Sequence, residues 1–192
     1  GSTANTFNMH NANALWTASM VDALDMTPEQ RSQHEHNRAI HYANMLQGAI
    51  YAQPFSEGSG AAAGRHPFGT VATRRDGGWV LNGKKIFASL SGSAQYYGVL
   101  CTEDVPNPTM AHTLFMAVPA NSPGLSIVGD WDPLGMRGTV SRTLLLKDIH
   151  LHHSKSFSRV RCRASPPPGA ATRRRLHRFF AFCVFRLRLP ID

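Results

Sequence analysis

The sequence predicts an α+β chain: a short helical segment is followed by an antiparallel β-barrel or sandwich and then by an irregular basic tail. Apolar residues have helical spacing before residue 50, and they alternate between turn residues from 50 to 153. Residues 154–192 follow neither period. A chain of 192 residues is long enough for one domain with a hydrophobic core.

Two antiparallel helices are predicted between residues 12 and 50, where apolar residues recur at three- and four-residue spacing. The second helix has a clear start. Thr27 can act as the N-cap, Pro28 takes the first helical position, and Gln30 stands where a capping box requires it. We expect this helix to end at Gly48.

Short strands separated by turn residues are predicted from residue 50 onward. Asp76-Gly77 favours positive φ at both turn positions and predicts a hairpin, and Asn82-Gly83 predicts a second turn of the same kind. The strands are expected at residues 70–74, 79–81, 85–89, 96–102, 113–118, 124–128 and 139–146. Seven or so strands at spacings near ten residues predict a barrel or sandwich.

The positive charge of the chain is concentrated in the tail. The net charge is +8, yet residues 1–150 carry ten Lys and Arg against eleven Asp and Glu, whereas residues 151–192 carry ten against one. A nucleic-acid-binding domain spreads basic residues over a folded face, so we expect no nucleic-acid partner. We interpret residues 154–192 as an unstructured appendage, such as a shifted reading frame would produce. Contact with an anionic membrane surface, or packing of the terminal aromatic residues on the helices or on a second chain, are the alternatives.

Cysteine and histidine usage gives no metal site. Three cysteines form no disulfide framework and no zinc pair, which favours a reducing compartment, so we expect a cytoplasmic protein. Histidines cluster at residues 34–41 and 150–153, but no acidic residue is placed to complete a tetrahedral site. No apolar run reaches the roughly 20 residues that a membrane span needs, and Gly1-Ser2 does not begin a signal peptide.

Two common catalytic signatures are not met. The glycines of residues 58–64 resemble a dinucleotide fingerprint, but their spacing is wrong by one residue and no helix is predicted to follow. The serines do not form a nucleophile elbow. We therefore expect neither a Rossmann-type nucleotide site nor a hydrolase.

Three segments, in order, resemble the middle domain of the acyl-CoA dehydrogenases: residues 53–60 (QPFSEGSG), 82–89 (NGKKIFAS) and 131–138 (WDPLGMRG). The first departs from the family by lacking the proline after Glu57. The resemblance covers roughly residues 45–153. It implies that residues 1–49 end an N-terminal helical domain, that residues 50–153 form a flavin-binding β-barrel domain, and that residues 154–192 are not a domain.

The resemblance also implies ligand contacts. FAD is the implied cofactor; the Phe87 ring would pack on the flavin, and the Ser89 hydroxyl would donate toward N5, the atom that accepts hydride. The implied cofactor-binding residues are Phe55, Ser56, Phe87, Ala88 and Ser89, and the implied substrate-binding residues are Ser59 and Gly60. From the residues alone, the alternative is that Phe87 belongs to the barrel core and Ser89 caps a strand end.

The implied activity is oxidation of the Cα–Cβ bond of an acyl-CoA, with an electron acceptor and a homo-oligomer in the complete family member. The family takes its catalytic base from a C-terminal helical bundle, and nothing after Leu151 is predicted to form one. We therefore assign no catalytic residue and expect this chain alone to be inactive. The alternatives are a non-catalytic remnant that binds a partner and a flavin-dependent monooxygenase on the same scaffold.

Overall fold

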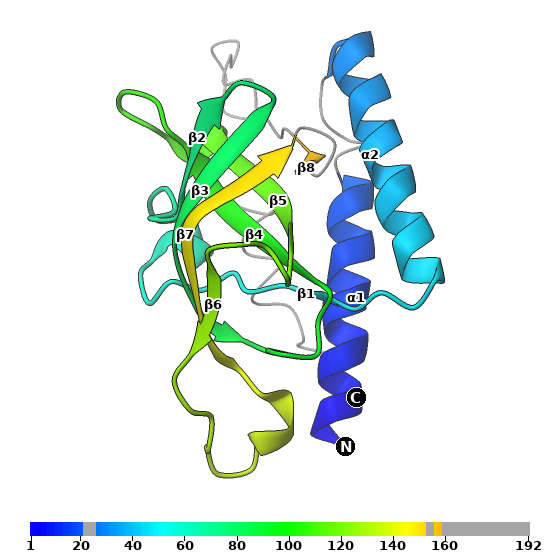
Figure 1. The fold of residues 1–192 in the computed structure, drawn as a ribbon, viewed down its shortest axis with the longest axis vertical. Coiled ribbons are helices and arrows are strands. Elements are labelled where there is room, and N and C mark those ends of the chain that lie inside the picture. Colours follow the sequence, from blue (N-terminus) through cyan, green and yellow to red (C-terminus); the bar gives the residue numbers. More distant parts are fainter. Residues whose placement is uncertain (21–25, 153–155, 159–192) are drawn as a thin grey trace, which may run out of the picture.

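A computed structural model describes residues 1–20, 26–152 and 156–158, in which two helices lie along one side of a curled sheet (Figure 1). The helices are α1 (Ser2–Met20) and α2 (Pro28–Leu46). The strands are β1 (Tyr51–Ala52), β2 (Val71–Arg75), β3 (Gly78–Ala88), β4 (Tyr96–Glu103), β5 (Thr113–Pro119), β6 (Leu125–Val128), β7 (Arg142–His152) and β8 (Ser156–Ser158). Three 3-10 turns are η2 (Ala61–Ala63), η3 (Met110–His112) and η4 (Arg137–Thr139).

The start of α2 confirms the predicted capping box. The Thr27 side chain accepts a hydrogen bond from the Gln30 backbone N–H, the Gln30 side chain accepts one from the Thr27 backbone, and Pro28 follows in the first turn. The helix ends at Leu46, and Gly48 has a φ of +91°. The α2 boundaries thus follow from local chemistry alone.

Helix α1 starts at Ser2, ten residues earlier than predicted. Its first half is polar and lacks an apolar period, so pattern analysis does not detect it. Contacts with the sheet hold it instead: His10 Nδ1 accepts from the Gln53 backbone N–H at 2.8 Å, and Asn11 Oδ1 accepts from the Tyr51 backbone N–H at 3.3 Å. Tertiary contacts commonly override weak local preference in this way.

The sheet is mixed rather than purely antiparallel. Its strand order is β6-β7-β3-β2-β4-β5-β8, and β1 pairs with β4. Most pairings are antiparallel, but β1 and β2 both run parallel to β4. Three residues of the predicted tail form β8 beside β5; residues 159–192, with the interpretations placed on them, lie outside the described residues.

The predicted turn at Asn82-Gly83 is wrong, because both residues lie inside the continuous strand β3. The pairing of β3 with β7 shifts register between Leu81 and Gly83. A Cβ at Gly83 would lie 2.5 to 2.7 Å from Thr70 atoms, so this glycine permits a close approach rather than a turn. The Asp76-Gly77 hairpin between β2 and β3 is confirmed, although only Gly77 has a positive φ there.

Two hydrophobic clusters lie on opposite faces of the central strands. Leu114 and Met116 of β5 point into the curled sheet, whereas Phe115 and Ala117 face the helices. Strands β4 and β5 are therefore buried on both faces, while β7 alternates between buried and exposed residues. The helices thus cover only one part of the sheet and leave the other part to solvent or to another partner.

Candidate functional site

Phe87 points out of the sheet although it lies two residues from the fully buried Lys85. In a regular strand, residues two apart share a face. Here the pairing with β7 shifts register between Lys85 and Ala88, and Phe87 has a φ of +54°, so its ring is 59% exposed. The alternative that Phe87 fills the barrel core is therefore wrong. Strained backbone of this kind at a bulge is frequently found at functional sites.

Trp131 supports the exposed Phe87 ring from the side. The two rings meet edge to face at a centroid distance of 6.1 Å and an interplanar angle of 75°. The Trp131 Nε1–H donates to the Met136 carbonyl at 2.9 Å, which fixes the indole within residues 131–141. Trp131 opens the third family-like segment, residues 131–138, and that position was the signal in the sequence; no role was predicted for it.

Ser89 lies just beyond β3 and joins a row of hydroxyl groups. Its Oγ lies 2.7 Å from Ser141 Oγ, which lies 2.8 Å from Thr139 Oγ1. Thr139 donates to the Met136 carbonyl at 2.9 Å. Ser89 is half-buried, whereas Ser141 and Thr139 are buried. Ser89 thus does more than cap a strand end, and sequence reasoning missed both of its hydroxyl neighbours.

The first and second predicted segments meet at Ser56. The Ser56 carbonyl accepts from the Ile86 backbone N–H at 2.8 Å, which sets Ser56 next to the strand that carries Phe87. Phe55 points elsewhere: it is half-buried and packs edge to face on Phe115 at 6.5 Å, on the helix-facing cluster. The Ala88 side chain is buried in the core.

The two predicted substrate-contacting residues lie in the loop after Glu57. Ser59 is exposed, and its Oγ accepts from the Ala61 backbone N–H at 3.3 Å at the start of η2. Gly60 is the residue before that turn, and a Cβ there would lie 2.9 Å from the Arg65 side chain. The structure therefore brings Ser56 beside Ile86, the residue before Phe87, and places Ser59 and Gly60 on the loop that follows Glu57. Phe55 and Ala88 point into the two hydrophobic clusters instead.

A buried ion pair, which the sequence analysis did not predict, lies behind this group. Lys85 Nζ contacts Glu57 Oε1 at 2.7 Å, and the two side chains are 0% and 7% exposed. Lys85 also donates to the Leu100 carbonyl at 2.5 Å and lies 4.5 Å above the Phe68 ring. Glu57 accepts from the backbone N–H of Gly69 at 2.6 Å and of Thr70 at 2.9 Å, so it anchors the loop to the sheet.

The ion pair stays charged. Burial raises the pKa of Glu57, but the Lys85 ammonium and the hydrogen bonds from Lys85 and Thr70 outweigh it, and the pKa lies below its ordinary value. Burial lowers the pKa of Lys85 below its ordinary value, although the charge of the Glu57 carboxylate and its hydrogen bond oppose that shift. Burial also raises the pKa of nearby Cys101 to about 12, so its thiol is not a nucleophile.

Buried histidines join the helices to the sheet. His10 contacts the Gln53 backbone, and His41 Nδ1 lies 2.9 Å from the Tyr51 hydroxyl. Burial lowers the pKa of each of these two histidines to about 4, so both are neutral near pH 7. His34 and His41 are buried on one face of α2 and His36 is exposed, as the helical spacing predicts. Within the described ranges, no group of three His, Cys, Asp or Glu residues could hold a metal ion.

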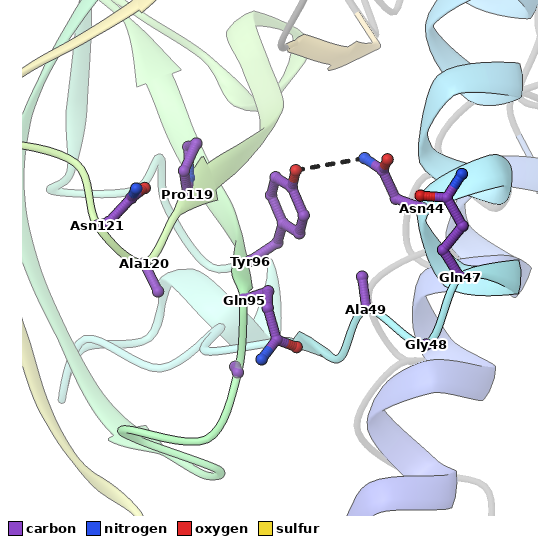
Figure 2. A pocket seen from close by; sticks show the side chains of 10 residues that line it. Asn44, Gln47, Gly48, Ala49, Gln95, Tyr96, Pro119, Ala120 and Asn121 are labelled. Atoms are coloured by element: carbon purple, nitrogen blue, oxygen red, sulfur yellow. Dashed lines mark hydrogen bonds between the residues drawn. The ribbon is translucent and has the colours of Figure 1, made fainter.

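A separate groove of about 680 Å³ lies between the end of α2 and the sheet. Figure 2 shows its lining, in which Asn44 of α2 donates to the Tyr96 hydroxyl of β4 at 3.3 Å. Its lining residues are uncharged, and the predicted site residues do not contribute to it. In the part of the chain that the structure covers, no helix is long and apolar enough to cross a membrane.

Comparison with known proteins identifies the fold. Residues 56–149 match the family model described as acyl-CoA dehydrogenase, middle domain. This segment therefore belongs to a family of flavoprotein oxidoreductases. The family is that of the acyl-CoA dehydrogenases, and the match is to its middle domain.

Individual relatives agree with this family. YdbM of Bacillus subtilis (strain 168), a protein assigned to the acyl-CoA dehydrogenases, is 31% identical over 143 residues, which are 73% of this chain and 35% of YdbM. The oxygenase component of an FADH2-dependent resorcinol hydroxylase from Rhizobium sp. (strain MTP-10005) is 37% identical over 81 residues, or 41% of this chain and 19% of that protein. A solved FAD-dependent dehydrogenase has a TM-score of 0.52 at 27% identity, covering 57% of this chain and 29% of its own. This chain thus spans about a third or less of the length of these relatives.

Proposed function

We propose that this chain supplies the flavin-facing half of an FAD-dependent acyl-CoA dehydrogenase site. The observation that carries the proposal is the Phe87 ring, held 59% exposed by a positive φ and by Trp131, next to the half-buried hydroxyl of Ser89. A flat isoalloxazine needs an apolar stacking surface and one polar contact at its reactive nitrogen. Phe87 and Ser89 fit that need.

When bound here, FAD would supply the hydride acceptor, N5, for the β-hydrogen of an acyl-CoA, while the α-proton would pass to a base that we do not assign among the described residues. Phe87 orients the ring and excludes water from one face, and Ser89 places a hydroxyl at its polar edge. Ser56 lies beside them through the Ile86 hydrogen bond and would contact the same ligand. Phe55 and Ala88, whose side chains pack inward, act by shaping the backbone, and Ser59 and Gly60 offer backbone and hydroxyl groups to the acyl-CoA.

The wider assignments rest on the family and on the printed names of the relatives. We assign residues 1–49 to the end of the helical domain, 50–153 to the flavin domain and 154–192 to a basic tail. The complete protein would use an electron acceptor and assemble as a homo-oligomer, in the cytoplasm. We assign no catalytic base among the described residues, because Glu57 is committed to Lys85 and does not face the Phe87 side of the strand.

The test is a titration of the purified full chain with FAD, in which quenching of the flavin fluorescence reports binding. Phe87→Ala should weaken binding by about 5- to 100-fold, the range that stacked aromatic contacts supply. Leu134→Ala is the matched control, because Leu134 is 96% exposed in the adjoining segment and should be neutral. A wild-type chain that does not bind FAD, or a Phe87→Ala chain that binds it equally well, would contradict the proposal.

A second candidate function is reduced-flavin chemistry with oxygen, supported by the resorcinol hydroxylase component among the relatives. The two candidates separate in one anaerobic titration of the complete protein, because we expect this chain alone to lack the base that flavin reduction by acyl-CoA needs. A dehydrogenase flavin is bleached by acyl-CoA without oxygen, whereas a monooxygenase flavin is reduced elsewhere and is then consumed only with oxygen. A chain that binds no flavin at all would favour the remaining alternative, a non-catalytic β-domain that binds a partner.

A further inference from the structure

Three hydroxyl groups form a hydrogen-bonded relay that ends at the proposed flavin contact. The relay is defined as Ser89, Ser141 and Thr139, linked at 2.7 and 2.8 Å, with Thr139 bonded to the Met136 carbonyl at 2.9 Å. Ser141 and Thr139 are only 6% and 3% exposed, so water cannot readily replace their partners.

The Met136 carbonyl fixes the direction of every proton in this relay. A carbonyl oxygen can only accept, so Thr139 must donate its single hydroxyl proton to it. Ser141 must then donate to Thr139, and Ser89 must donate to Ser141. The only proton of the Ser89 hydroxyl is thus used within the relay, and its remaining lone pairs can only accept. This differs from the expectation, drawn from the family resemblance, that Ser89 donates toward N5.

Such a hydroxyl distinguishes the two oxidation states of a flavin. N5 of oxidised flavin is a hydrogen-bond acceptor, whereas N5 of fully reduced flavin carries a hydrogen and donates. Resting on the proposed function, we propose that Ser141 and Thr139 are positioning residues that hold Ser89 as an acceptor and so favour the reduced cofactor. The relay already uses one hydroxyl proton for each of its three hydrogen bonds. A fourth hydrogen bond, to oxidised N5, would need a fourth proton, which the three hydroxyl groups do not have.

The same carbonyl also fixes the stacking residue. Met136 accepts from Trp131 Nε1 at 2.9 Å, and Trp131 holds the Phe87 ring at 6.1 Å. One backbone group in the segment 131–141 therefore sets both the ring that stacks and the hydroxyl that meets N5. Backbone bonds from Leu90 N–H to the Thr139 carbonyl at 2.8 Å and from Ser91 N–H to the Val140 carbonyl at 3.2 Å hold this segment beside the end of β3.

The first experiment tests the relay without any ligand. Urea unfolding of the full chain is measured for wild type, Ser89→Ala, Ser141→Ala and the double variant. The two serines should be coupled by at least about twofold in the unfolding equilibrium constant. Ser91→Ala is the matched control, because Ser91 is also 6% exposed but donates to the Ala88 carbonyl outside the relay. Additive effects of Ser89→Ala and Ser141→Ala would overturn the relay.

The second experiment measures dissociation constants for oxidised FAD and for dithionite-reduced FAD under anaerobic conditions. Ser141→Ala frees the Ser89 proton, so the ratio of the oxidised to the reduced constant should fall by about 3- to 10-fold. Tenfold corresponds to a midpoint potential lower by about 30 mV for two electrons. Thr139→Val should act in the same direction, and Thr139→Ser should restore the wild-type ratio.

The outcomes separate this inference from the proposed function. A ratio unchanged by Ser141→Ala in a chain that binds FAD would overturn the redox role of the relay and leave the flavin site standing. Ser141→Ala is also made in the Ser89→Ala variant. If it lowers the ratio of the two dissociation constants there as well, Ser141 does not act through Ser89, and the redox role of the relay is overturned. A wild-type chain that binds neither form of FAD would overturn the proposed function itself, and with it the redox role, whatever the unfolding cycle shows.

Discussion

Lys85 and Phe87 stand two residues apart on β3, yet one is fully buried and the other is 59% exposed. Lys85 is fixed by a carboxylate and a carbonyl inside the protein, and it secures the loop that contains Glu57. Phe87 is turned outward by a bulge, and its ring packs edge to face on Trp131. The first position stabilises the domain, and the second is the position at which we propose that a ligand packs. The difference teaches that a register shift can place neighbouring residues of one strand in opposite environments.

The largest effect is expected from breaking the buried pair. Glu57→Gln leaves the Lys85 ammonium buried without its counter-charge, which should lower the free energy of unfolding by about 3–5 kcal/mol in urea denaturation. Asp132→Asn is the matched control, since it breaks the Asp132–Arg137 pair, whose side chains are 76% and 66% exposed. That exposed pair should contribute within about 0.5 kcal/mol. Equal losses in the two variants would contradict this contrast.

As pH falls, the contacts of His10 and His41 between the helices and the sheet should weaken before the Glu57–Lys85 ion pair does. The pKa of His10 and of His41 is about 4 in the fold, against 6.5 in the unfolded chain. Because the unfolded state takes up protons first, stability is lost as pH falls from 6.5 toward 4, by about 2 kcal/mol per histidine at pH 5. The pKa of Glu57 is lowered from 4.5, so its contribution is lost only below that pH.

Urea unfolding at pH 7.5 and at pH 5 measures this loss. His41→Gln should remove about half of the pH dependence between these two values. His36→Gln, at an exposed position of the same helix, should leave the dependence unchanged. A free energy of unfolding that is constant from pH 7.5 to pH 5 would refute the buried neutral state of both histidines.

A smaller effect is expected at the other register shift of β3, between Leu81 and Gly83. Gly83→Ala would place a Cβ at 2.5 to 2.7 Å from Thr70, and overpacking of this kind costs about 1–3 kcal/mol. Gly77→Ala, in the open hairpin turn, tests backbone strain without crowding, because nothing lies within 4 Å of a Cβ there. Thermal denaturation of both variants separates the cost of crowding at Gly83 from the cost of backbone strain at Gly77. A Gly83→Ala protein with an unchanged melting temperature would show that Thr70 can move aside.

The smallest stability effect is expected on the exposed side. Trp131→Ala removes an edge-to-face pair and one hydrogen bond at the surface, and should cost about 1 kcal/mol or less in urea denaturation. Its effect on FAD binding should be clearly larger than its effect on stability, because the Phe87 ring loses its support. If Trp131→Ala strongly lowers the free energy of unfolding, the Phe87–Trp131 pair stabilises the fold and its role is not specific to ligand binding.

Sequence chemistry predicted those features that depend on neighbours in the chain. The Thr27 capping box and the Asp76-Gly77 hairpin were found because each depends on residues within a few positions. The turn predicted at Asn82-Gly83 was wrong because the conformation of these residues depends on distant partners. Asn82 bonds to Asp148, 66 residues away, and Gly83 packs on Thr70. Local turn preference yields to such contacts.

The candidate site was predictable only through its likeness to a family. Phe87 and Ser89 were named from a matching segment, while their exposure depends on a register shift that no local pattern encodes. The ion pair between Glu57 and Lys85 joins residues 28 apart, and the relay joins Ser89 to Ser141 over 52 residues. The parallel pairing of β2 with β4 likewise depends on which strands meet in space.

The N-terminus of α1 lies at the same end of the molecule as the loop between β6 and β7 (Figure 1). The Thr3 hydroxyl of its first turn donates to the Gly138 carbonyl of that loop at 3.1 Å. An affinity tag fused ahead of Gly1 would therefore emerge beside the segment that carries Trp131 and Thr139. Measurements of cofactor affinity are best made after such a tag has been cleaved, since its side chains could otherwise mimic or obstruct the ligand.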